Sequence, residues 1–293
     1  APPGVCKSFM FARCRRGAKC CFSHDVAKSV LEVKSAPVRS VLTSSADMQD
    51  ASQKPATAPS SRSWRSVDYL LRGQTVQENT YLQEFASATW LTEVLAAPEC
   101  TNLFSIRSRS LRKELTEAFG CLSACRRIAA KLGKELASGS GLVLIDLCCG
   151  KGFGSLVLAS ALPEAVVLAV DSNPKMELSH FRIRPNLSFH CFDITRCDAG
   201  SELSQLVDAA HGSMAVCIVV GMHLCGALSH SAISLYGTLW APCKGLVLAP
   251  CCLDGRQPRT KRVAKKLGIS PHRFWCLSLL WTLPRGEGHR QEL

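Results

Sequence analysis

A glycine turn between two apolar segments most constrains the fold of this chain. The apolar run 141–145 leads into the segment 146–154 (DLCCGKGFG), and a second apolar run follows at 155–159. This order predicts a buried strand, a tight turn and an apolar helix start, the arrangement in which a nucleotide-like ligand meets a parallel sheet. Asp171 closes the next apolar run, 19 residues after Gly152. An acidic side chain there can accept hydrogen bonds from both hydroxyls of a ribose, so we expect a cofactor of the adenosine type.

Two common nucleotide motifs do not fit this segment. Counted from Gly150, the dinucleotide fingerprint G-x-G-x-x-G has Ser155 at its third glycine, and no G-x-x-x-x-G-K-[ST] sequence is present. The segment instead resembles the first motif of class I S-adenosylmethionine (SAM) methyltransferases, hydrophobic-D-x-G-x-G-x-G. In that alignment Gly150 and Gly152 occupy the second and third glycines, and Cys148 stands at the first. A cysteine fits this position if its φ is negative.

Apolar runs and helical patterns alternate beyond residue 141, which predicts a parallel α/β sheet with helices on both faces. Strands are expected at 142–147, 166–171, 187–192, 215–221, 245–250 and 274–283. Helices are expected at 153–162, 175–180, 201–211, 227–238 and 258–267. Class I methyltransferases have a seventh strand, and because only ten residues follow Leu283 that strand is missing, altered or cut off.

The N-terminal segment has the ligand spacing of a zinc site. Cys6, Cys14, Cys20 and His24 form the pattern C-x7-C-x5-C-x3-H, and three thiolates with one imidazole complete a tetrahedral shell. Cys21 leaves an alternative spacing open. The segment closely resembles the CCCH zinc-finger family, whose spacing favours Cys20. Because so short a segment cannot bury a core, zinc is expected to supply its folding free energy.

The resemblance to CCCH fingers implies that this segment binds single-stranded RNA, with aromatic rings stacking on bases and basic side chains meeting phosphates. The candidates for these contacts are Phe9, Phe11, Arg13, Arg16 and Phe22. The formal net charge of +12 also favours a polyanionic partner, and a second basic group lies between Arg256 and Lys266.

Four regions are expected along the chain. They are a CCCH zinc finger at 1–25, a flexible linker at 26–65, a helical segment at 66–140 and a SAM-dependent methyltransferase domain at 141–293. The linker is rich in Ser, Ala and Pro, whereas the helical segment repeats apolar residues at helical intervals and is expected to end with a helix at 122–137. The predicted fold class is therefore α/β, a Rossmann-like methyltransferase sheet with a helical layer before it and a small finger.

The composition is typical of an intracellular protein of the nucleus or cytoplasm. No apolar stretch reaches membrane-spanning length, so no membrane association is expected. There is no basic-then-apolar signal pattern at the start, and we interpret the 17 cysteines as reduced thiols.

Ligands of an open α/β sheet lie at the carboxyl ends of its strands, and the candidate site residues gather there. The expected cofactor-binding residues are Asp146, Cys149, Gly150, Gly152, Asp171 and Asp193. Asp171 is assigned to the ribose and Asp193 to the adenine amino group. His223-Leu-Cys-Gly follows the fourth expected strand, and Pro250-Cys-Cys follows the fifth.

These two motifs resemble those of the eukaryotic tRNA 2′-O-methyltransferases, which also carry small N-terminal zinc motifs, and of related methyltransferase-like proteins. The resemblance spans roughly residues 141–255 and implies a SAM-dependent methyltransferase of RNA, without fixing which RNA. The leading hypothesis is a tRNA substrate methylated at a ribose 2′-oxygen. Leu253-Asp254 stands where the tRNA enzymes tend to have histidines, a departure that bears on the substrate.

His223 is the first candidate for proton transfer, because an imidazole can accept the proton that a ribose hydroxyl loses as it attacks a methyl group. Asp254 is an alternative base. Cys225, with Cys251 and Cys252, leaves open an RNA 5-methylcytosine mechanism, in which a thiolate attacks the base and a second cysteine releases the product. Two further hypotheses are a catalytically inactive RNA-binding scaffold and a methyltransferase of a protein or small molecule.

Overall fold

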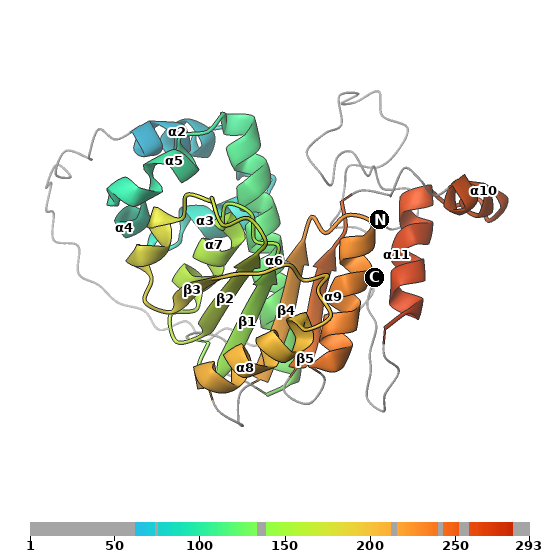
Figure 1. Ribbon diagram of the computed structural model, residues 1–293. Coiled ribbons are helices and arrows are strands. Elements are labelled where there is room, and N and C mark those ends of the chain that lie inside the picture. The colour runs from blue at the N-terminus through green and yellow to red at the C-terminus, as the bar shows by residue number, and fades with distance from the viewer. Residues whose placement is uncertain are drawn as a thin grey trace, which may run out of the picture. The chain divides into compact units, whose positions relative to one another are not determined.

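Five parallel strands form one sheet in the order β3-β2-β1-β4-β5 (Figure 1). The computed structural model describes residues 62–73, 76–133, 139–211, 216–239, 243–251 and 258–283. The strands within these ranges are β1 (Leu142–Leu147), β2 (Val166–Asp171), β3 (Leu187–Cys191), β4 (Val216–Met222) and β5 (Cys243–Ala249). The order changes direction between β1 and β4, so the carboxyl ends of these two strands flank the point where a ligand of such a sheet binds.

Strand β1 is the centre of the sheet and is buried along its whole length. Its side chains alternate between two apolar clusters. Leu142 and Leu144 face a cluster formed with the preceding helices, whereas Val143 and Ile145 face a second cluster on the other side. The continuous apolar run that predicted a buried strand is explained by this double coverage.

A layer of helices covers the first face. It consists of α2 (Arg62–Leu71), α3 (Thr80–Ala86), α4 (Leu91–Ala96), the short helices η4 (Pro98–Cys100) and α5 (Thr101–Phe104), α6 (Ser108–Lys131) and α7 (Phe153–Ala161). Helix α6 packs against both α3 and α7 (Figure 1). The helix expected at 122–137 overlaps the second half of α6, which runs unbroken through Gly120 to Lys131.

The second face is covered by α8 (Ala199–His211) and α9 (Ala227–Thr238). Helix α11 (Pro271–Trp281) lies outside α9, and the two pack through Ile233, Trp275 and Leu279. Helix α10 (Pro258–Lys266) packs on α11 at the edge of the fold (Figure 1). The Rossmann-like α/β fold expected from the sequence is therefore confirmed.

Two expected elements are wrong. The strand expected at 274–283 is helix α11, because Ser270 caps its first turn by accepting from the Arg273 N–H and Pro271 stands at its first position. The helix expected at 175–180 is a turn followed by a short 3-10 helix, η5 (Ser179–Ile183). In that turn the Asn173 side chain accepts from the Lys175 N–H, which competes with helix formation.

Helix α2 begins at Arg62, inside the last residues assigned to the linker. The zinc finger and most of the linker lie outside the described residues. None of the helices in the described part of the chain has the length and apolar character needed to cross a membrane.

Candidate active site

The glycine turn after β1 contains three residues with positive φ. These are Cys148 (55°), Gly150 (54°) and Gly152 (68°). The expectation of a negative φ at Cys148 is therefore wrong, and a side chain occupies a conformation that glycine adopts more easily. A Cβ on Gly150 would meet nothing within 4 Å, so the backbone there borders open space. A ligand can approach the main chain of this turn closely.

Gly152 is required for a different reason. A Cβ at this position would lie 2.2 Å from Cε1 of Phe181, which packs from η5 against the turn. Gly152 is also the N-cap of α7, whose first N–H groups point away from the helix toward the turn. Such a helix start favours a negatively charged or electron-rich ligand group.

Asp171 ties the turn to the end of β2. The Gly150 N–H donates to its Oδ2 and the Asn173 N–H donates to its Oδ1, both at 3.0 Å. These bonds fix the carboxylate at the carboxyl edge, and each oxygen keeps a second lone pair for a ligand hydroxyl. The ribose role predicted for Asp171 fits this geometry and stays a prediction.

Asp146 is buried beneath the turn, with 4% of its surface exposed. The hydroxyl of Ser155 donates to its Oδ2 at 2.6 Å. Burial raises the pKa of Asp146 to about 6, the charge of Asp171 adds to the effect, and the Ser155 hydrogen bond opposes it. Ser155, which breaks the dinucleotide fingerprint, therefore has a role of its own as the partner of this carboxyl group.

The two cysteines of the turn are poor nucleophiles. Burial and the neighbouring carboxylates raise the pKa of Cys148 to about 12 and the pKa of Cys149 still further. Because the thiolate is the reactive form, neither side chain reacts readily at neutral pH. Asp193 follows β3 and is exposed, and its Oδ1 accepts from the N–H and the hydroxyl of Thr195, both at 2.8 Å.

His223 lies at the end of β4 in a left-handed conformation, with φ of 62°. Its N–H donates to the carbonyl of Ala249 at 3.0 Å, which joins the β4 and β5 loops. A non-glycine residue in this conformation costs about 1–3 kcal/mol and persists only where its surroundings hold it, most often at functional sites. The side chain is 38% exposed and is accessible to a ligand.

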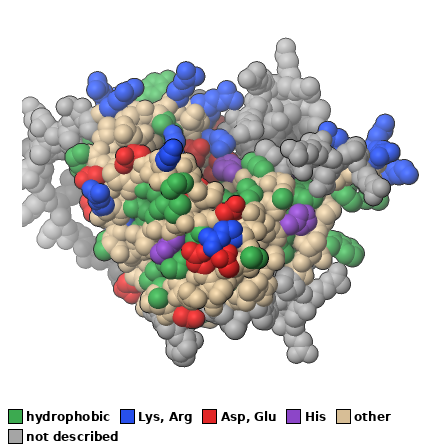
Figure 2. Space-filling model, viewed as in Figure 1, with side chains coloured by type: hydrophobic (Ala, Val, Ile, Leu, Met, Phe, Trp, Pro, Cys, Tyr) green, Lys and Arg blue, Asp and Glu red, His purple; other side chains and the backbone are tan. Residues whose placement is uncertain are grey.

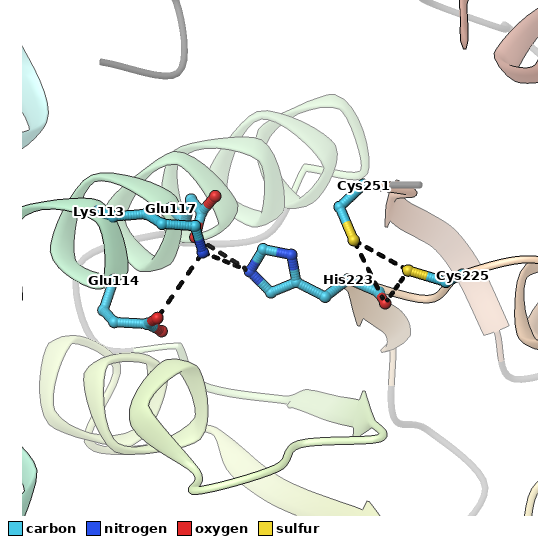
Figure 3. Close-up of polar contacts among 6 residues, drawn as sticks. All are labelled: Lys113, Glu114, Glu117, His223, Cys225 and Cys251. Carbon is cyan, nitrogen blue, oxygen red and sulfur yellow. Dashed lines mark hydrogen bonds and ion pairs between the residues drawn. The ribbon is translucent and has the colours of Figure 1, made fainter. Parts of the chain in front are cut away.

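The imidazole of His223 reaches two side chains of α6 (Figure 3). Its Nε2 lies 3.0 Å from Oε2 of Glu117 and 3.2 Å from Nζ of Lys113, and Lys113 and Glu117 form an ion pair at 2.6 Å. Burial alone would raise the pKa of Glu117, but hydrogen bonds from His223 and Lys113 outweigh it and lower that pKa. Glu117 is therefore an anion that can hold a proton on Nε2.

These contacts are compatible with both neutral tautomers, because a protonated Nε2 can donate to Glu117 and a bare Nε2 can accept from Lys113. When Nε2 carries a proton and donates to Glu117, Nδ1 keeps its lone pair and can accept a proton. Among the described residues none hydrogen-bonds Nδ1 of His223. The sequence prediction missed Lys113 and Glu117. The available signal was their i,i+4 spacing on a predicted helix, which is also common in helices without a functional site.

Cys225 and Cys251 lie beside His223. Their sulfur atoms are 2.9 Å apart, and both approach the carbonyl oxygen of His223, at 3.1 and 3.8 Å (Figure 3). The structure thus brings together the two loops that carried the cysteine hypothesis. Asp254 and Cys252 lie outside the described residues, as do all the predicted zinc ligands and RNA contacts of the finger. Within the described ranges no cluster of His, Cys, Asp and Glu can hold a metal ion.

Comparison with protein families identifies the region around this site. Residues 119–256 match the family model described as a methyltransferase domain. The match includes the whole sheet, the glycine turn and both His223 and Cys251. No curated protein matches the chain.

Three solved structures resemble the chain at low identity. The plantazolicin methyltransferase BpumL in complex with SAH is 15% identical, with a TM-score of 0.31 over 62% of this chain and 58% of its own. A possible exported protein of Bordetella parapertussis is 15% identical, with a TM-score of 0.32 over 78% of this chain and 84% of its own. Human N-acetylserotonin methyltransferase in complex with SAM is 16% identical, with a TM-score of 0.24 over 60% and 45%.

Because the identities and TM-scores are low, the three structures indicate nothing about the substrate of this chain. The chain spans 58% of the length of the first of them. The matched family, a methyltransferase domain, is consistent with the parallel strand order β3-β2-β1-β4-β5. Residues 119–256 thus match a model of a methyltransferase domain, and the described part of the chain has a Rossmann-like α/β sheet.

Proposed function

We propose that this chain is a SAM-dependent RNA methyltransferase that acts on tRNA at a ribose 2′-oxygen. The observation that carries the proposal is the strained His223, held by Glu117 at the carboxyl end of β4 beside the glycine turn. In the proposed enzyme a CCCH finger at residues 1–25 binds zinc and adds RNA affinity.

The residues around the turn fit SAM. The open backbone at Gly150 allows close approach, Asp171 offers acceptors for a ribose, and the buried carboxyl group of Asp146 favours a cationic ligand. Asp193 and Cys149 border the same edge of the sheet. When bound, SAM would supply an electrophilic methyl group on a sulfonium centre.

In this proposal His223 is the general base that accepts the proton of the ribose hydroxyl. In such a methyl transfer, which would break the S–CH₃ bond and release a thioether, Nδ1 of His223 would accept the proton that the ribose hydroxyl loses, and Glu117 would stabilise the resulting imidazolium through Nε2. Lys113 keeps Glu117 ionised by pairing with it. The 38% exposure of His223 leaves room for the substrate to reach it.

A first experiment identifies the reaction. RNA incubated with the protein and SAM is digested to nucleosides and analysed by mass spectrometry, and a 2′-O-methylated nucleoside is the expected product. SAM calorimetry on wild type and Asp171→Ala tests the cofactor site, where the variant is expected to bind more weakly. Methyl transfer to no RNA fraction would support the scaffold hypothesis, and transfer to RNase-resistant material would support a different substrate.

A second experiment tests the His223–Glu117 contact. Glu117→Gln is expected to lower kcat roughly 10–100-fold, the worth of a hydrogen bond to a charged group, with little change in KM for RNA or in SAM affinity. Glu114→Gln is the matched control, because Glu114 contacts Lys113 at 3.7 Å and does not reach His223 (Figure 3). Equal effects of both substitutions would refute a specific role for Glu117.

The cysteine pair supports a second candidate, RNA 5-methylcytosine formation. The 2.9 Å separation of Cys225 and Cys251 suits one thiol that attacks a base and another that releases the product. Under this mechanism Cys225→Ala or Cys251→Ala abolishes turnover while His223→Ala is tolerated. Under the ribose mechanism His223→Ala lowers kcat roughly 10²–10⁴-fold, and either cysteine substitution is tolerated.

A further inference from the structure

Helix α10 carries four exposed basic side chains on one short segment. These are Lys261, Arg262, Lys265 and Lys266, and the helix contains no acidic residue. Nine residues at ~1.5 Å each make a helix only about 14 Å long, so the charges are close together. Thr260 and Ala264 are buried, so the basic side chains lie on the surface that faces solvent.

This arrangement is electrostatically unfavourable on its own. Lys261 and Lys265 are an i,i+4 pair of like charge, and so are Arg262 and Lys266, and each such pair destabilises a helix by a few tenths of a kcal/mol. The helix C-terminus offsets this only in part, for the two lysines of the last turn. An anionic partner with regularly spaced charges would relieve the repulsion.

Helix α10 is connected to the β5 end of the candidate active site through α11. Four residues, 267–270, join it to α11. The first turn of α11 is fixed to the end of β5 by His272, whose Nε2 donates to the carbonyl of Pro250 at 2.8 Å. Pro250 precedes Cys251, which contacts the His223 loop. The basic helix therefore lies beyond α11, on the β5 side of the sheet (Figure 1).

A second basic group stands on the other side of the site. Arg107 and Arg109 are exposed at the start of α6, one turn before Lys113, which reaches His223. Figure 2 shows lysine and arginine side chains along the top of the molecule, over α2 and α6, and again over α10 at the right. His223 therefore lies between two positively charged surfaces.

We propose that α10 binds the phosphate backbone of an RNA, and that Arg107 and Arg109 bind it on the opposite side of His223. This inference rests on the proposed function and specifies which surfaces of the protein the RNA substrate contacts. Lysine and arginine that neutralise phosphates release condensed counterions, which gives RNA affinity without base recognition. The finger is not needed for this contact, because α10, Arg107 and Arg109 belong to the compact unit Ser60–Leu293.

Val263 of α10 and Leu267, just after the helix, leave apolar surface exposed. A basic helix with apolar residues is also typical of binding to an anionic membrane. RNA is favoured because the helix is short, is joined to the β5 loop through α11, and is accompanied by further basic residues at the start of α6. Membrane binding is therefore one of the outcomes that the test distinguishes.

The test compares two double variants of the full chain with equal net charge. Lys265→Ala/Lys266→Ala removes two charges from α10. Arg127→Ala/Lys244→Ala removes two exposed charges from the opposite edge of the sheet, where Ile128 of α6 packs against Gly245 at the start of β5. Alanine is the strongest helix former, so α10 should keep its structure. Thermal unfolding checks both variants.

Binding of fluorescein-labelled unfractionated tRNA is measured by anisotropy between about 50 and 200 mM salt, without SAM. The α10 variant is expected to bind roughly ten- to fiftyfold more weakly, with a salt slope smaller by about 1.4–1.8, whereas the control changes by less than about twofold. If the α10 variant unfolds, Lys266→Gln replaces it, with an expected slope change of about 0.7–0.9.

Three results would overturn the proposal. They are equal weakening by both double variants, unchanged tRNA binding by the α10 variant, and loss of binding to phosphatidylserine vesicles with tRNA binding intact. Failure of the proposed reaction is distinguishable, because binding is measured without methyl transfer. Selective loss of tRNA binding with no methylated nucleoside in any RNA would refute the reaction and leave the surface in place.

Discussion

Replacing Asp146 with asparagine should stabilise the ligand-free protein at neutral pH. The carboxyl group is 4% exposed, and its pKa of about 6 shows that the folded protein resists its ionisation. The asparagine side chain of the variant would keep an oxygen that accepts from Ser155, whose hydroxyl lies 2.6 Å from the carboxylate in the native protein. The substitution therefore removes a buried charge and keeps its hydrogen bond.

The magnitude follows from proton linkage. Raising the pKa from 3.8 in the unfolded chain to about 6 in the folded protein corresponds to about 3 kcal/mol, at about 1.4 kcal/mol per pKa unit. Because the folded protein binds the proton more tightly, this destabilisation is absent below about pH 4, grows as pH rises to about 6 and is constant above it. Asp146→Asn should gain about 3 kcal/mol at pH 7.5 and about 0.5 kcal/mol at pH 4.

The assay is urea unfolding of both proteins at several pH values, without SAM. Asp193→Asn is the control, because Asp193 is an exposed carboxylate at the next strand end and hydrogen bonds to Thr195 lower its pKa, so no stabilisation is expected. A gain that is the same at pH 4 and pH 7.5 would show that packing, and not charge, is responsible. No gain at pH 7.5 would refute the reasoning. The same variant should bind SAM more weakly, as measured by calorimetry.

Three further predictions concern other parts of the chain. Cys20→Ser should lose one bound zinc ion and Cys21→Ser should keep it, as metal analysis would show, and the reverse result would assign the alternative spacing. Deletion of residues 1–60 should raise KM for RNA and leave kcat unchanged, because a module on a flexible linker adds equal binding to ground and transition states; a large loss of kcat would place the finger in the active site. Cys148→Gly should leave SAM affinity intact and stabilise the protein by up to about 1 kcal/mol in urea unfolding, because glycine adopts the φ of 55° without strain; clear destabilisation would show that the thiol contributes packing.

The sequence predicted the central sheet well because its signals are local. Strands β1 and β2 have the expected bounds, and the glycine turn between β1 and α7 lies where the motif indicated. Each of these elements is a continuous apolar run bounded by turn residues, which leaves little choice of structure. The carboxyl edge followed from the parallel order, so Asp171 and His223 were expected on the same side of the sheet.

The errors arose where an apolar run has two interpretations. Residues 274–283 contain enough aromatic and aliphatic residues for a strand, but Trp275 and Leu279 pack four residues apart on Ile233, which is a helical spacing. The positive φ of Cys148 could not be read from its residue type, because cysteine has no preference for that conformation. The contact of Glu117 with His223 joins distant segments, and its only local signal is the unspecific i,i+4 spacing of Lys113 and Glu117.

The Glu117–His223 contact changes how the helical layer is interpreted. The family match begins at residue 119, so Lys113 and Glu117 lie just before the part of the chain that it identifies. These two residues nevertheless reach the strand-four loop, while Leu115 and Phe119 of the same helix are buried in the core shared with β1. One face of α6 packs in the core, and a neighbouring face contacts the strained His223. A shift of α6 would therefore disturb both the core packing and the His223 contact. The layer before the sheet is therefore expected to fix the geometry of the candidate base, and substitutions in its packing face should lower kcat as well as stability.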